Sequence, residues 1–102
     1  MGYYINPAVG EKEEFLSRCG KEVSLKEWLA FSKPDSLYAA VCLIKNPVFS
    51  AAGIAYSVAE AEAFTSALDM RPKRFFLVPW EQVIQHGGIS NETAARLQGK
   101  KS

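Results

Sequence analysis

The chain has 102 residues, of which 48% are hydrophobic and 23% are charged, and its formal net charge is +1. This length corresponds to one domain, so we expect a single domain over residues 1–102 with a frayed tail at 97–102. The near-neutral charge argues against a nucleic-acid-binding protein that depends on a large basic surface. No apolar run approaches the roughly 18 residues of a membrane span, and the N-terminus has no signal-peptide pattern, so we expect a cytoplasmic protein.

The first third of the chain predicts one short strand and two helices. Residues 3–5 favour a strand. Pro7 follows closely and places that strand at a sheet edge, because proline has no backbone N–H to donate to a neighbouring strand. An acidic first turn and an apolar face predict a helix over 11–19, which Gly20 ends. Ser24 and Glu27 match a capping box. They predict a second helix whose buried face carries Leu25, Trp28, Leu29 and Phe31.

The middle of the chain predicts a hairpin, a helix and a strand. Residues 39–44 are almost continuously apolar, which is typical of a central strand buried on both faces. Residues 48–56 form the second arm and are rich in small side chains, with Gly53 as a candidate bulge. A second capping box, which begins at Ser57, starts a helix that continues to about Leu68. The last strand covers residues 73–78.

Two short helices close the sequence, at 80–86 after Pro79 and at 92–97. The order of all these elements predicts an α+β fold. We expect a single small domain with a three- or four-stranded, mainly antiparallel sheet and helices packed mostly on one face.

The chain offers few groups for chemistry. It contains two cysteines, Cys19 and Cys42, and one histidine, His86, fewer than the four ligands of a structural zinc site. No glycine-rich phosphate loop and no Gly-x-Ser-x-Gly elbow occur in it. Both cysteines fall at apolar positions, so we expect buried free thiols. We therefore expect no enzymatic activity, no catalytic residue, no metal and no cofactor; a small enzyme that uses these three groups stays open as an alternative.

Two surface features are candidate partner-binding sites. Arg71, Lys73 and Arg74 cluster around Pro72 in a basic turn, a pattern that suits an acidic patch or a phosphate. The alternative is an ordinary basic turn that protects the sheet from edge pairing. Tyr3 and Tyr4 are neighbours in a strand, so one of them faces outward, where tyrosine suits a protein interface. A tyrosine that merely packs on the domain is the alternative there.

Three segments together resemble a group of small, uncharacterised proteins from bacteriophages and plasmids. They are the start Gly2-Tyr3-Tyr4-Ile5-Asn6-Pro7, the middle Val41–Ile44 with Ala51–Tyr56, and Arg71-Pro72-Lys73-Arg74-Phe75-Phe76-Leu77-Val78-Pro79. The resemblance covers roughly residues 1–82. It implies a mobile-element accessory protein that acts in the cytoplasm of a bacterial host cell, and it brings no catalytic residue with it.

These observations lead to a functional hypothesis and an alternative. We expect a non-enzymatic phage or mobile-element protein that binds and blocks a protein partner from host or phage, because a small domain presents about 800 Å² to a partner without any reactive group. An anti-CRISPR-like inhibitor of a host defence system is one form. The expected anchors are Tyr3, Tyr4, Arg71, Lys73 and Arg74. The alternative is a weak nucleic-acid-binding accessory factor that uses the basic turn. We expect no membrane partner, and the oligomeric state stays open.

Overall fold

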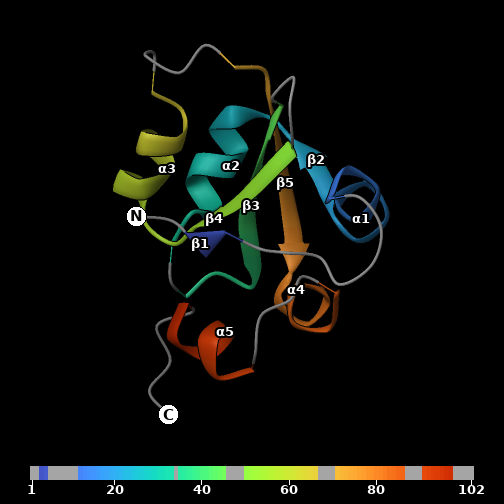
Figure 1. Cartoon of the computed structure of the whole chain (residues 1–102). Coiled ribbons are helices and arrows are strands. Elements are labelled where there is room, and N and C mark those ends of the chain that lie inside the picture. Colours follow the sequence, from blue (N-terminus) through green and yellow to red (C-terminus); the bar gives the residue numbers. More distant parts are fainter. Residues whose placement is uncertain are drawn as a thin grey trace.

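The computed structural model describes residues 3–4, 12–33, 35–45, 50–66, 71–86 and 91–97. The elements in this part of the chain are β1 (Tyr3–Tyr4), α1 (Lys12–Cys19), β2 (Lys21–Val23), α2 (Leu25–Phe31), β3 (Tyr38–Lys45), β4 (Ser50–Ala55), α3 (Val58–Phe64), β5 (Lys73–Pro79), α4 (Trp80–His86) and α5 (Asn91–Leu97). Helices and strands are interspersed around one sheet (Figure 1), so the predicted α+β class is confirmed.

The sheet has the strand order β1-β4-β3-β5-β2, and all neighbouring strands are antiparallel. The predicted central strand is confirmed, since Val41 of β3 lies opposite Ile54 of β4 and Phe76 of β5. Among the described residues the sheet therefore has five strands, where the sequence predicted three or four. The additional strand is β2, a three-residue segment with two charged residues that is too short and polar to show a strand pattern. The pairing continues regularly through Gly53, so the described register contains no bulge there.

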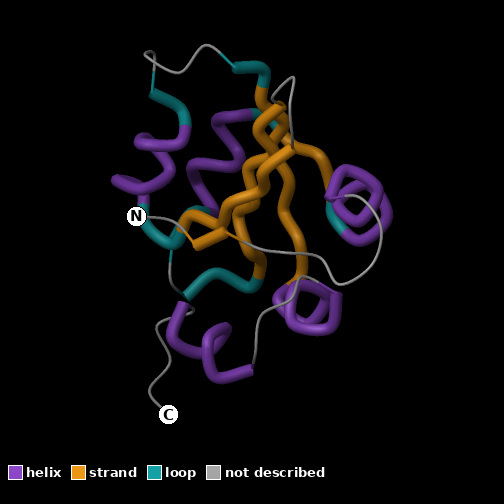
Figure 2. The backbone as a smooth tube through the Cα atoms, in the orientation of Figure 1, coloured by secondary structure: helices purple, strands orange, loops and turns teal. Residues whose placement is uncertain are grey.

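Helices cover both faces of the sheet, which differs from the expectation that they pack mostly on one face. One face of β3 carries Ala39, Val41 and Leu43, and these pack with residues of α1, α4 and α5. The opposite face carries Ala40, Cys42 and Ile44, and these pack with residues of α2 and α3. Figure 2 shows the strands running between the helices. An apolar side chain at nearly every position of β3 requires cover on both sides.

In both predicted capping boxes, the hydrogen bond to the serine hydroxyl is present. The Ser24 hydroxyl accepts a hydrogen bond from the Glu27 amide at 3.3 Å, and the Ser57 hydroxyl accepts one from the Glu60 amide at 3.1 Å. The reciprocal bond from the Ser24 amide to the Glu27 carboxylate is not among the hydrogen bonds of the described residues. The α3 helix ends at Phe64 with Thr65 as its C-cap, and Ser66 is not helical, so the predicted continuation to about Leu68 is wrong.

The inward face predicted for α2 is only partly correct. Trp28 is fully buried, whereas Leu25 in the first turn is 41% exposed. Trp28 is also the one fully enclosed side chain of this helix, so it anchors α2 to the sheet. None of the helices in the described part of the chain is long and apolar enough to cross a bilayer.

Candidate functional site

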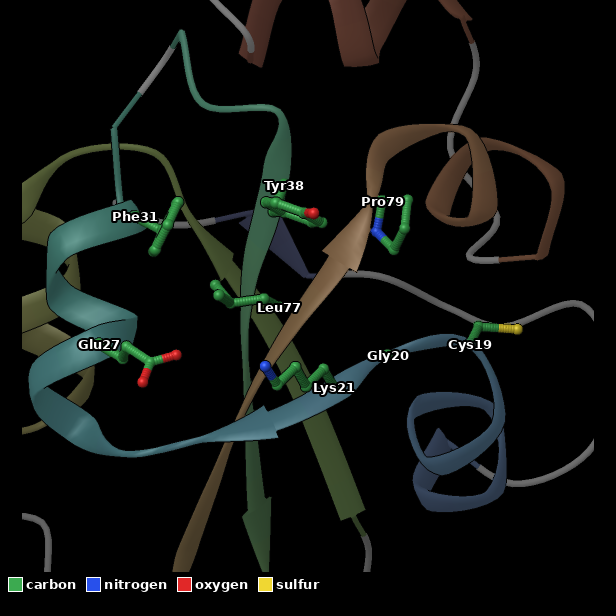
Figure 3. Close-up of a pocket in the computed structure, with 8 residues that line it drawn as sticks. All are labelled: Cys19, Gly20, Lys21, Glu27, Phe31, Tyr38, Leu77 and Pro79. Carbon is green, nitrogen blue, oxygen red and sulfur yellow. The ribbon is translucent and has the colours of Figure 1, made fainter.

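A pocket of about 400 Å³ lies at the β2 edge of the sheet, on the face that α2 covers (Figure 3). Leu77 of β5 forms its floor. Phe31 of α2, Tyr38 of β3 and Pro79 of β5 form an apolar wall, in which the Phe31 and Tyr38 rings meet edge-on with centroids 5.9 Å apart. The remaining lining residues are Cys19, Gly20, Lys21 and Glu27. We call this feature the β2-edge pocket; its volume is in the range of sites that bind a ligand or a large side chain.

Two opposite charges face the β2-edge pocket. Lys21 is the register partner of Leu77, so its side chain lies on the same face as the pocket floor. Glu27 lies in the first turn of α2, and its carboxylate points toward the pocket from the other side (Figure 3). Within the described part of the chain, neither side chain forms an ion pair. The pocket therefore combines an apolar wall with an ammonium and a carboxylate that are both available to a binding partner.

The loop before β3 carries an exposed apolar side chain. Leu37 is 83% exposed, and the adjacent Tyr38 is 39% exposed. The preceding residue, Ser36, is buried; its carbonyl accepts a hydrogen bond from the Trp80 indole at 3.0 Å, and its hydroxyl accepts one from the Tyr38 amide at 3.2 Å. These bonds hold the backbone on both sides of Leu37, so its exposure is a feature of an anchored loop.

Four charged side chains from four elements form an ion-pair cluster on the other face of the sheet. Arg74 of β5 contacts Glu22 of β2 through two hydrogen bonds, Nη2–Oε1 at 2.8 Å and Nε–Oε2 at 3.0 Å. Its Nη1 donates to Oε1 of Glu13 in α1 at 2.8 Å, and Lys45 of β3 pairs with the same carboxylate. The Arg74 guanidinium also lies 5.1 Å from the centroid of the Phe76 ring. The cluster links α1 to three strands.

The ion-pair cluster lowers the pKa of both glutamates. The hydrogen bond from Lys45, and then the charges of Lys45 and Arg74, hold the pKa of Glu13 below its ordinary value of 4.5. The hydrogen bond from Arg74 does the same for the pKa of Glu22. At a pH just below 4.5, the two glutamates therefore bind protons more readily in the unfolded chain than in the folded chain. As a result, the free energy of unfolding decreases as the pH falls through the folded pKa values.

We predict that Arg74→Gln is less stable than the wild type near neutral pH, and that the difference shrinks at a pH well below 4.5, where both carboxyl groups are protonated. Higher salt reduces the difference at neutral pH as well, because the partners are partly exposed. Urea unfolding at both pH values measures this effect. Arg18→Gln is the matched control, since Arg18 is exposed on α1 and lies outside the cluster. A pH-independent difference for Arg74→Gln would contradict the prediction.

The predicted anchors of the basic turn have different environments. Arg71 is exposed, and its carbonyl accepts a hydrogen bond from the half-buried Lys73 at 3.1 Å. Arg74 instead belongs to the ion-pair cluster, where Glu13 and Glu22 neutralise it, so an acidic partner or a phosphate would have to displace them. The sequence did not indicate these partners because they lie 61 and 52 residues away along the chain.

The other predicted anchors lie at the opposite edge of the sheet. The backbone of Tyr3 pairs with Ile54, and that of Tyr4 pairs with Gly53, so the predicted edge strand is confirmed. Their side chains lie outside the described part of the structure, and the outward-facing tyrosine stays a prediction. The structure does not bring these residues into contact with the basic turn, because β1 and β5 are three strand spacings apart, about 14 Å.

The groups considered for an enzyme do not meet in the described structure. Cys42 is buried in β3, whereas Cys19 is half-buried at the end of α1 with its sulfur directed away from Leu77 (Figure 3). The two cysteines form no disulfide. His86 ends α4, and its side chain is outside the described part. Within the described residues, no group of three or more His, Cys, Asp or Glu side chains is arranged to hold a metal ion.

The two thiols are expected to differ in reactivity. We predict that a thiol reagent labels Cys19 in the native protein and labels Cys42 at least about 100-fold more slowly, because Cys42 reacts only when the sheet opens. Mass spectrometry of peptides after timed labelling measures both rates, and Cys19→Ser identifies the fast site. Equal rates for the two cysteines would contradict the burial of Cys42.

Comparisons with known proteins give no match: no protein-family model, no curated protein and no solved structure matches the chain.

Proposed function

We propose that this chain is a non-enzymatic binding protein that acts by occupying a surface of a protein partner. Its resemblance to phage and plasmid proteins favours an accessory protein of a mobile element, and an inhibitor of a host defence system is a concrete form of that role. Blocking a partner requires a shaped surface and a few anchors, and it requires no reactive group.

The observation that carries this proposal is the position of β1 at the end of the sheet. In the described sheet, β1 pairs with β4 on one side and with no strand on the other. The main-chain groups on an outer strand can pair with an extended segment of another protein, and neighbouring tyrosines supply area and hydrogen bonds to such a contact. Tyr3 and Tyr4 are therefore the proposed anchors at this edge.

The basic turn supplies the second part of the proposed contact surface. Lys73 is opposite Ile44, and Ile44 is opposite Ala51 of β4, so the turn lies on the same sheet as β1 and about 15 Å from it. A standard interface of about 800 Å² per partner is roughly 30 Å across. One partner could therefore contact β1 together with Arg71 and Lys73, while Arg74 stays in the ion-pair cluster.

A pull-down from host lysate tests the proposal. The tagged wild type is compared with Tyr3→Ala/Tyr4→Ala and with Arg71→Glu/Lys73→Glu, and Arg74 is left unchanged because its reversal would also break the ion-pair cluster. The matched control for the charge reversal is Arg18→Glu/Arg96→Glu, at two exposed arginines on other elements. We expect one host protein that the wild type and the control retain and that both site variants lose. Equal retention by all four proteins would place the contact elsewhere.

The alternative, a weak nucleic-acid-binding factor, has less support because Arg74 is neutralised by Glu13 and Glu22. A salt titration separates the two candidates, since phosphate contacts weaken steeply between low and moderate salt. Absence of DNA and RNA binding even at low salt would exclude the alternative.

A further inference from the structure

The β2-edge pocket is apolar at one end and charged at the other (Figure 3). The Phe31 and Tyr38 rings lie at one end, the side chains of Lys21 and Glu27 lie at the other, and Leu77 lies between them. The two rings meet edge-on with their centroids 5.9 Å apart, so together they form one aromatic surface. This division suits a small molecule with an apolar part for the rings and a charged part for the other end.

The two charged groups are directed toward one another across the pocket. Figure 3 shows the ammonium of Lys21, on β2, and the carboxylate of Glu27, on α2, pointing toward each other. They form no ion pair in the described part of the chain, and both line the pocket, so part of its volume lies between them. Both residues are exposed, so a ligand can reach them from solvent.

The opposite signs of these two charges select the class of ligand. A purely anionic ligand would meet Glu27 and a purely cationic ligand would meet Lys21, and each like-charge contact is unfavourable. A neutral apolar molecule would pair with neither group. A zwitterion with one carboxylate and one ammonium pairs with both. In an α-amino acid a single tetrahedral carbon carries these two groups and a side chain, so the three groups diverge toward Lys21, Glu27 and the aromatic end.

We propose that the β2-edge pocket binds a free α-amino acid with a large apolar side chain, such as phenylalanine. The ligand carboxylate accepts a hydrogen bond from the Lys21 ammonium, and the ligand ammonium donates one to the Glu27 carboxylate. The ligand side chain packs on Leu77 and on the aromatic rings. A residue inside a polypeptide has neither main-chain charge, so a segment of a protein partner does not fit this pattern.

This site goes beyond the proposed function and does not depend on it. The pocket lies at the β2 edge of the sheet, whereas β1 forms the opposite edge, so a protein partner at β1 leaves the pocket open. Substitutions at Lys21 and Glu27 therefore test the amino-acid site without changing the β1 edge.

Titration of the isotope-labelled full chain with phenylalanine, followed by NMR of the backbone amides, tests the proposal. We expect saturable shifts at the pocket residues, none at β1, and a Kd on the order of 1 mM, because water screens charges at exposed positions. Phenethylamine lacks the carboxylate and hydrocinnamate lacks the ammonium, so we expect each to bind at least about fivefold more weakly. Glycine lacks the apolar side chain, and its binding is expected to be weaker by on the order of tenfold or more.

Variants without one charge assign each contact. Lys21→Gln is expected to bind phenylalanine at least about fivefold more weakly, and no better than phenethylamine, because the ligand carboxylate has lost its partner. Glu27→Gln is expected to bind phenylalanine no better than hydrocinnamate. The matched controls are Lys26→Gln and Glu62→Gln, which remove the same charges at exposed positions outside the pocket and are expected to bind like the wild type. The amide spectrum verifies that each variant is folded.

Three results would overturn the proposal. The first is the absence of saturable shifts with phenylalanine up to about 10 mM, or shifts confined to residues outside the pocket. The second is a wild type that binds phenethylamine or hydrocinnamate as tightly as phenylalanine, since one charge of the ligand would then have no partner. The third is binding of phenylalanine that Lys21→Gln and Glu27→Gln leave unchanged.

Discussion

Replacing Trp28 with alanine is expected to lower the free energy of unfolding by about 3–5 kcal/mol, the largest effect of any single substitution considered for this chain. Trp28 is fully buried and packs against the Phe75 ring with the centroids 5.3 Å apart. It is the buried anchor of α2, the helix that supplies Glu27 and Phe31 to the β2-edge pocket. Loss of the indole therefore removes core contacts and loosens one wall of the pocket.

The matched variant is Trp28→Phe. The indole Nε1 of Trp28 is buried and, among the described groups, has no hydrogen-bond partner. Phenylalanine removes that unsatisfied donor and keeps an aromatic ring, so we expect a loss of only about 1 kcal/mol from the smaller volume. Urea or thermal unfolding followed by circular dichroism measures both variants. Equal destabilisation by Trp28→Phe and Trp28→Ala would indicate that the indole N–H has a partner that stabilises the fold.

Replacing Gly20 with alanine is expected to lower the free energy of unfolding by about 1–3 kcal/mol. A Cβ atom on Gly20 would lie 2.8 Å from Cγ2 of Val78 and 2.9 Å from the carbonyl oxygen of Leu16. The second contact is with backbone, so it cannot be relieved by a side-chain rotation. The Gly20 amide also donates to that carbonyl at 2.8 Å, which keeps the two groups together at the end of α1.

The control for Gly20→Ala is Ser17→Ala in the same helix, where the side chain is exposed and alanine favours the helix. We expect this control to be neutral or slightly stabilising in the same unfolding experiment. A Gly20→Ala protein as stable as the wild type would show that α1 and β5 do not approach as closely as the structure indicates.

The parts of the fold that were predicted correctly are those with strong local patterns. The apolar run of β3 and the serines that begin α2 and α3 are specified within a few residues of sequence. The short strand β2 has no such pattern, because Lys21 and Glu22 are held in the sheet by their pairing with β5. Because β3 is apolar at nearly every position, its sequence indicates that both faces of the sheet are covered. Which helix packs on which face depends on contacts between residues that are distant along the chain.

The candidate site was predicted less well, for the same physical reason. The cluster of cations around Pro72 is visible in the sequence, whereas the pairing of Arg74 with Glu13 and Glu22 arises only when α1 and β2 pack against β5. The β2-edge pocket combines residues of five separate elements, and no local pattern joins them.

Site-specific photo-crosslinking in host cells tests most directly whether this chain works by contact at its β1 edge. A photoreactive phenylalanine analogue replaces Tyr3 at that edge or, as the comparison, Glu62, which is exposed on α3. We expect a single covalent adduct with one host protein from position 3 and none with that protein from position 62. The absence of any adduct from position 3, or the same adducts from both positions, would contradict a partner surface at this edge.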